Sequence, residues 1–108
     1  MKIFKDRLSH NAKLICAWGE AGAAAYDHGS RTVYSSDAFP PAEIVDTLGA
    51  GDTFNAAVIC SLSSGVDLKD AIEIGCRVAG AKIGQRGYDG VGETFKNELR
   101  RHVSSRNA

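Results

Sequence analysis

The sequence predicts an α/β fold in which short strands come first and two or three helices follow. Residues 13–36 contain short apolar or alternating runs separated by turn-forming residues, a pattern typical of strands. Residues 53–83 instead place apolar side chains three and four positions apart, which is typical of helices. At 108 residues with 44% apolar side chains, the chain can form one small domain with a buried core.

The strands are expected in the first part of the chain. KLICAW (13–18) is a short apolar run that predicts a buried strand, and the turn-prone GEAG follows it. The next stretch, AAAYDHGSRTVYSS, predicts two strands joined around DHGS, with Gly29 supplying the tight turn. We therefore expect a strand that leads into a hairpin.

An extended connector and a first helix are expected next. The two prolines in FPPAEIVD (39–46) disfavour both a helix and a central strand. From Thr53 to about Ser63, apolar residues recur at helical spacing and leave little polar face. We expect this helix to be buried nearly all round.

A second helix is expected from Leu68 to Ile83. Gly65 is a suitable terminator for the helix before it, and Asp67 is a suitable N-cap. The apolar residues of this segment fall on one face, which predicts packing on one side only.

The last part of the chain is expected to be a loop and a third helix. The four glycines of GQRGYDGVG, residues 84–92, predict the loop. Phe95, Leu99 and Val103 then mark one stripe of a polar helix that frays into SSRNA.

Composition narrows the possible partners. Thirteen basic and thirteen acidic residues cancel, so no overall field draws the chain to nucleic acid or an anionic membrane. No apolar run near the beginning is long enough for a signal peptide or membrane span, so we expect a cytoplasmic protein.

The cysteines lack metal-ligand spacing and are interpreted as free, mostly buried thiols. We interpret the histidines as solvated surface residues without a chemical role: His10, His28 and His102.

The segment DTLGAGD (46–52) is the strongest candidate for a functional site. Two glycines precede a helix start, where bare backbone N–H groups attract anions. The P-loop pattern fails because its lysine and Ser/Thr are not in place, and the dinucleotide fingerprint fails because Phe54 stands where its third glycine belongs.

Asp52 has two interpretations at this stage. It could cap the helix, since aspartate satisfies free N–H groups and complements the helix dipole. It could instead accept the proton of a hydroxyl that attacks a phosphate bound at the turn. Capping alone does not explain why both Gly49 and Gly51 clear space above the turn.

The pattern D-T-x-G-A-G-D resembles the C-terminal signature of the ribokinase-like (PfkB) sugar kinases. The resemblance covers about residues 13–91 and implies the C-terminal portion of a three-layer α/β/α fold. It also implies transfer of a phosphoryl group from ATP, with Mg²⁺, to a sugar hydroxyl. The segments SSDAFPP and GCRVAGAKIGQRGYDGV narrow the resemblance to members that convert fructose to fructose 1-phosphate.

The resemblance implies a role for each matching residue. Asp52 would contact the sugar as catalytic base, and the anion hole would consist of Gly49, Ala50 and Gly51. Asp46 would help to hold a monovalent cation, usually K⁺, with carbonyls near Gly87. The nucleotide would be bound by Gly19, Glu20, Ala21, Gly22, Phe39, Pro40, Cys76 and Ala79. Phe39 and Cys76 could also be packing residues, and Asp46 could simply bond to turn N–H groups.

The chain departs from the family pattern in its length. Family members are two to three times longer, and most sugar contacts and the sheet through which they pair as homodimers lie in the part without a match here. We therefore expect a piece of a longer product, a very poor kinase by itself, with residues 92–108 as an extra helix and tail. The alternative is a non-catalytic module for nucleotide binding or assembly.

Overall fold

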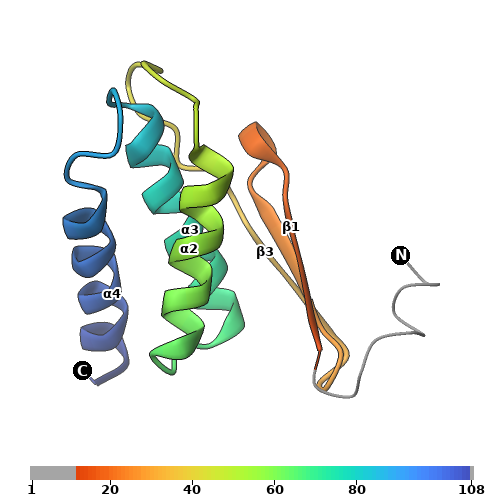
Figure 1. The fold of residues 1–108 in the computed structure, drawn as a ribbon. Helices are drawn as coiled ribbons and strands as arrows, with labels where there is room; N and C mark the ends of the chain where they lie inside the picture. The colour runs from red at the N-terminus through yellow and green to blue at the C-terminus, as the bar shows by residue number, and fades with distance from the viewer. Residues whose placement is uncertain (1–11, 108) are drawn as a thin grey trace.

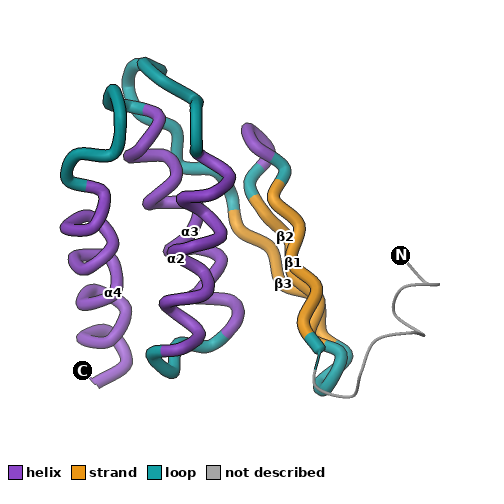
Figure 2. The backbone as a smooth tube through the Cα atoms, in the orientation of Figure 1, coloured by secondary structure: helices purple, strands orange, loops and turns teal. Residues whose placement is uncertain are grey.

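The computed structural model describes residues 12–107, and these form a three-stranded sheet with three long helices on one side of it (Figures 1 and 2). The strands come first in the chain and the helices follow, which confirms the predicted fold class. The elements are β1 (Lys13–Ala17), the 3₁₀ turn η1 (Gly19–Ala21), β2 (Ala23–Asp27), β3 (Thr32–Ser36), α2 (Ala50–Ser63), α3 (Leu68–Ile83) and α4 (Val91–Asn107).

The sheet is an antiparallel meander in the order β1-β2-β3. The hairpin between β2 and β3 confirms the expected order, but Gly29 does not supply its special turn conformation. Arg31 is the turn residue with a positive φ, 56°, while the N–H of Gly29 donates to the Asp27 carboxylate at 3.0 Å. The prediction of a buried first strand is wrong as well, because β1 lies at the sheet edge with its middle residues only half-buried.

Helix α2 begins three residues earlier than predicted and is not buried all round. Phe54 and Val58 are buried against α3, whereas Ile59 is 63% exposed and Cys60 is also exposed. The prediction failed because helical spacing shows that side chains are apolar but not whether a neighbour covers them. Among the described residues, only one face of α2 is fully covered.

Helix α3 has the predicted bounds and is the centre of the molecule. The Asp67 side chain caps it by accepting from the N–H of Asp70 at 2.9 Å, and Gly65 follows the end of α2 with a φ of 88°. Packing on one side only is wrong, because α3 contacts α2, α4, β2 and β3. Gly75 allows α3 to pack closely against α2, because a Cβ there would lie only 2.7 Å from a Val58 methyl carbon.

Helix α4 covers another side of α3. Phe95 and Leu99 pack against the core, as the stripe predicted, while the side chain of Val103 lies outside the described residues. The loop is shorter than predicted, because Gly92 already belongs to α4, and the helical backbone continues to Asn107 instead of fraying. No helix in the described part of the chain is long and apolar enough to cross a membrane.

His28 and His102 are less solvated than predicted. His28 contacts the Tyr26 hydroxyl at 3.2 Å, and the His102 side chain is only 11% exposed at the seam of α3 and α4. Burial by itself lowers the pKa of His102, but bonds to the Glu98 carbonyl and the Glu73 carboxylate outweigh it and raise the pKa overall. His10 lies outside the described residues.

Candidate functional site

The glycine turn joins the connector to the first turn of α2. Gly49 is the N-cap residue and has a φ of 79°, a left-handed conformation that glycine adopts without strain. A Cβ at Gly49 would collide with the hydroxyl of Tyr88, whereas a Cβ at Gly51 would meet nothing within 4 Å. The space above Gly49 is therefore taken by Tyr88, and only the space above Gly51 is open.

Backbone donors remain free at this helix start. The N–H of Ala50 donates to the Thr47 carbonyl at 3.3 Å, and the first bond of the helix proper runs from Thr53 to the Gly49 carbonyl at 2.9 Å. Among the described residues, the N–H groups of Gly51 and Asp52 have no hydrogen-bond partner. Free donors at the positive end of a helix dipole form a suitable place for an anion.

Asp52 is exposed in the first turn of α2 and does not cap it. The helix start has no side-chain cap bond, and the N-cap position belongs to Gly49. Within the described part of the chain, the Asp52 carboxylate makes no hydrogen bond or ion pair. Asp52 therefore does not cap α2 through a hydrogen bond, and only the interaction of its charge with the helix dipole supports a structural role.

Asp46, at the other side of the turn, is held by three donors. Its Oδ1 accepts from the N–H of Leu48 at 3.0 Å, and its Oδ2 accepts from the N–H of Gly87 at 3.2 Å and from Lys82 Nζ at 3.1 Å. The bonds from Leu48, Gly87 and Lys82, in that order, lower the pKa of Asp46 below its usual 3.8. The bond to a turn N–H, one of the two interpretations of Asp46, is thus present.

Lys82 is a functional candidate that sequence reasoning missed. Its side chain is fully buried, and its ammonium donates to both the carboxylate and the backbone carbonyl of Asp46, the latter at 3.2 Å. The ammonium also lies 5.1 Å from the ring centre of Tyr88. A signal existed in the sequence, because Lys82 interrupts the apolar face of α3 seven residues after Gly75.

A hollow of about 420 Å³ opens beside the turn. Asp52 and Tyr88 lie on its wall, and most of the remaining lining is apolar side chain from α2 and α4. Asp52 is therefore both solvent-exposed and next to a concave surface, a position from which a carboxylate can reach a bound molecule.

The residues assigned to the nucleotide lie near one another at one end of the sheet. The backbone of Gly22 packs so closely on the segment after β3 that a Cβ would collide with the Ser36 carbonyl. Phe39, a little further along, packs its carbonyl against Gly80 of α3. The 3₁₀ turn, the start of α2 and the end of α3 all lie at the upper end of Figure 1.

Three of these nucleotide candidates also contribute to packing. Cys76 is buried in the core, and Phe39 and Ala79 pack against it. Burial is the main cause that raises the pKa of the Cys76 thiol. The guanidinium of Arg77 lies 4.0 Å from the centre of the Phe39 ring, so one face of that ring already has a partner. Pro40 is exposed and Glu20 lies at the surface of the turn.

The three cysteines are free, as predicted, but the prediction that they are mostly buried is wrong. Cys76 is buried, Cys16 is half-buried and Cys60 is exposed on the open face of α2.

Comparison with known proteins identifies the family to which the chain belongs. Residues 3–94 match the pfkB family carbohydrate kinase, so the chain belongs to this family. Solved structures agree on a ribokinase-like fold. A ribokinase of Cryptococcus neoformans in complex with ADP superposes with a TM-score of 0.71 and 29% identity over 89% of this chain and 31% of its own. A ribokinase of Arabidopsis thaliana complexed with ribose and ATP gives 0.70 at 23% identity, over 81% and 28% of the two chains.

Two relatives of named activity are also similar to most of this chain. Mouse ketohexokinase is 53% identical over 86 residues, which cover 80% of this chain and 28% of the enzyme. The ribokinase of Bacillus subtilis is 38% identical over 93 residues, 86% of this chain and 30% of that enzyme. The chain thus spans less than a third of the length of these relatives.

Proposed function

We propose that this chain is the nucleotide-binding and catalytic-base portion of a sugar kinase that transfers the γ-phosphoryl group of ATP to a ketohexose, with fructose to fructose 1-phosphate as the reaction. The proposal rests on one observation: free backbone N–H groups and a carboxylate without a hydrogen bond lie together at the start of α2. Similarity to mouse ketohexokinase supports a ketohexose as acceptor.

The proposed reaction divides the work between backbone and side chain. The N–H groups of Gly51 and Asp52 donate to the phosphate undergoing transfer and stabilise its charge, whereas the Ala50 N–H already donates to the Thr47 carbonyl. The Asp52 carboxylate takes the proton of the sugar hydroxyl while that oxygen forms its bond to phosphorus and the bond to ADP breaks. ATP supplies the phosphoryl group, and Mg²⁺ shields its negative charges.

Asp46 also has room for the proposed monovalent cation. Its Oδ2 accepts two hydrogen bonds, but its Oδ1 accepts only one, from Leu48. A carboxylate oxygen has two lone pairs, so Oδ1 keeps one position that could contact K⁺. The nearby Gly87 carbonyl accepts a long bond of 3.4 Å from the Gln85 amide and is a further candidate ligand.

Calorimetric titration of the purified chain with ATP, Mg²⁺ and K⁺ tests the nucleotide half of the proposal. Binding is expected, and Gly51→Val should abolish it because the side chain would fill the open space over the free N–H groups. Gly65→Ala, a change at a distant positive-φ glycine, serves as the control for general damage. Absence of ATP binding by a chain that circular dichroism shows to be folded would contradict binding by this portion alone.

Catalysis needs the rest of a kinase. A chimera can supply the missing part of the enzyme: this chain's segment replaces the matching 86-residue segment of mouse ketohexokinase. The chimera is expected to phosphorylate fructose, which requires this chain's segment to supply the anion site and the base. A folded chimera that binds ATP without turnover would favour the alternative, a non-catalytic nucleotide-binding module.

A further inference from the structure

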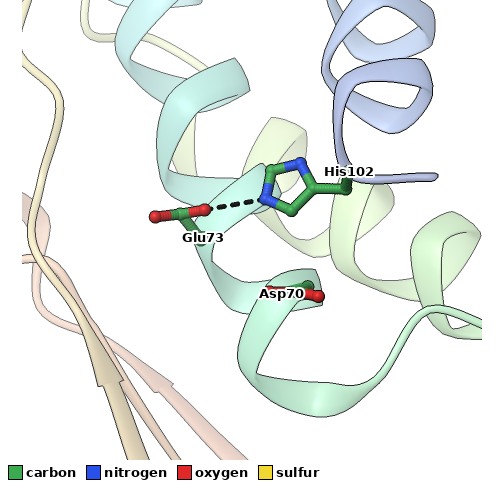
Figure 3. A group of neighbouring side chains, drawn as sticks. All are labelled: Asp70, Glu73 and His102. Atoms are coloured by element: carbon green, nitrogen blue, oxygen red, sulfur yellow. Dashed lines mark hydrogen bonds and ion pairs between the residues drawn. The ribbon is translucent and has the colours of Figure 1, made fainter. Parts of the chain in front are cut away.

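Three metal-ligating side chains meet at the seam of α3 and α4, in a part of the molecule that the proposed kinase reaction does not use. Asp70 and Glu73 stand one helical turn apart on α3, and His102 reaches them from α4 (Figure 3). One ligand atom from each residue lies within 4.8 Å of the other two. Two helices far apart in sequence therefore bring an imidazole and two carboxylates together.

The orientation of His102 is fixed from outside this group. Its Nδ1 lies 2.9 Å from the backbone carbonyl of Glu98, and a carbonyl oxygen can only accept, so Nδ1 carries a hydrogen and donates it. Its Nε2 faces Glu73 Oε2 at 2.7 Å (Figure 3). A carboxylate oxygen also only accepts, so at this distance Nε2 donates a hydrogen as well, and a metal ion would displace that proton and bind the lone pair that it leaves beside the carboxylates.

We propose that Asp70, Glu73 and His102 form a binding site for a divalent metal ion of the zinc class, which ties α4 to α3. Three atoms within 4.8 Å of one another leave a point within about 2.8 Å of all three, against Zn–N and Zn–O distances of about 2.0–2.2 Å. Small side-chain movements close that difference, and the Glu73 side chain, which is 38% exposed, has room for them once a metal ion replaces its bond to His102.

The donor set selects the type of metal. Imidazole is a good ligand for zinc, nickel and cobalt, whereas magnesium and calcium prefer oxygen ligands alone. Three protein ligands leave a fourth tetrahedral position for water. A positive charge within the described residues opposes the site: the Arg77 guanidinium lies 3.9 Å from Glu73 Oε1, which leaves Oε2 as the ligand atom. We therefore expect micromolar rather than nanomolar affinity.

Metal titration of the tag-free chain tests the site. Every variant carries Cys60→Ser, because the exposed Cys60 thiol could bind zinc by itself. Zn²⁺ is titrated by calorimetry and Co²⁺ by its visible absorption, both at pH 7.5. We expect one Zn²⁺ per chain and a rise in Tm of several degrees at metal concentrations a hundredfold above the dissociation constant. Mg²⁺ at the same concentrations should leave Tm unchanged.

Variants decide between a metal site and a simple ion pair. His102→Gln and Asp70→Asn should each weaken Zn²⁺ binding at least about tenfold, while His28→Gln, outside the group, should not. Asp70→Asn is informative even if His102→Gln loosens α4, because no hydrogen bond or ion pair in the described residues uses the Asp70 carboxylate. Two results would overturn the proposal. One is a folded chain that does not bind Zn²⁺ at 1 mM, about a hundredfold above the expected dissociation constant. The other is Zn²⁺ binding that neither substitution weakens.

Discussion

Asp46 and Asp52 lie on opposite sides of one glycine turn, and their surroundings are opposite too. Asp46 accepts hydrogen bonds from two backbone N–H groups and from a buried ammonium. The Asp52 carboxylate is exposed and, among the described residues, makes no hydrogen bond or ion pair. The difference suggests a division of roles in which Asp46 holds the turn in place and Asp52 stays available for a reacting group.

The largest expected effect is on turnover. Asp52→Asn in the ketohexokinase chimera should lower kcat by about 10²- to 10⁴-fold, the usual contribution of a general base. ATP affinity should change little, because the amide keeps the shape of the side chain and the backbone donors remain. Steady-state kinetics with fructose and calorimetry with ATP measure the two quantities. Unchanged kcat would remove Asp52 from the role of base.

The two glycines of the turn should respond differently to the same substitution. Gly49→Ala should lower the free energy of unfolding by at least about 1 kcal/mol, because a non-glycine residue is strained at this φ and the Cβ meets Tyr88. Gly51→Ala meets no neighbour and should be neutral or stabilising by up to about 1 kcal/mol. Urea unfolding of both variants measures the contrast. Equal losses would show that Gly51 is also required by the fold.

The Asp46 bonds should appear in the acid dependence of stability. The folded-state pKa of Asp46 lies below its usual 3.8, so its stabilising contribution is complete above that value and is lost as the pH falls through the folded-state pKa. Asp46→Asn should therefore be less stable than the wild type at pH 7, and the gap should narrow below pH 3.8. Urea unfolding at several pH values tests this. A gap independent of pH would mean that the charge of Asp46 does not matter.

Local patterns in the sequence were sufficient for the elements but not for their surroundings. The bounds of α3, its Asp67 cap and the antiparallel hairpin follow from neighbouring residues, and all three are present. Burial depends on distant neighbours, so apolar spacing exaggerated the burial of α2 and underestimated that of α3.

The site was predictable to the same extent. The motif located the turn and both carboxylates, because they are contiguous in sequence. It gave no indication of the Lys82 ammonium or the Tyr88 hydroxyl, which come from the end of α3 and the loop after it. Residues that meet only through tertiary packing leave at most a weak trace, here one lysine in phase with apolar neighbours.

The most direct measurement of the proposed division of roles compares Asp46→Asn and Asp52→Asn in the same chimera, with Tm and kcat recorded for each. We expect Asp52→Asn to keep its unfolding free energy within about 0.5 kcal/mol while losing turnover. Asp46→Asn should show the larger fall in Tm, because the buried Lys82 loses its charged partner. A large loss of Tm for Asp52→Asn, or normal turnover by that variant, would contradict the account.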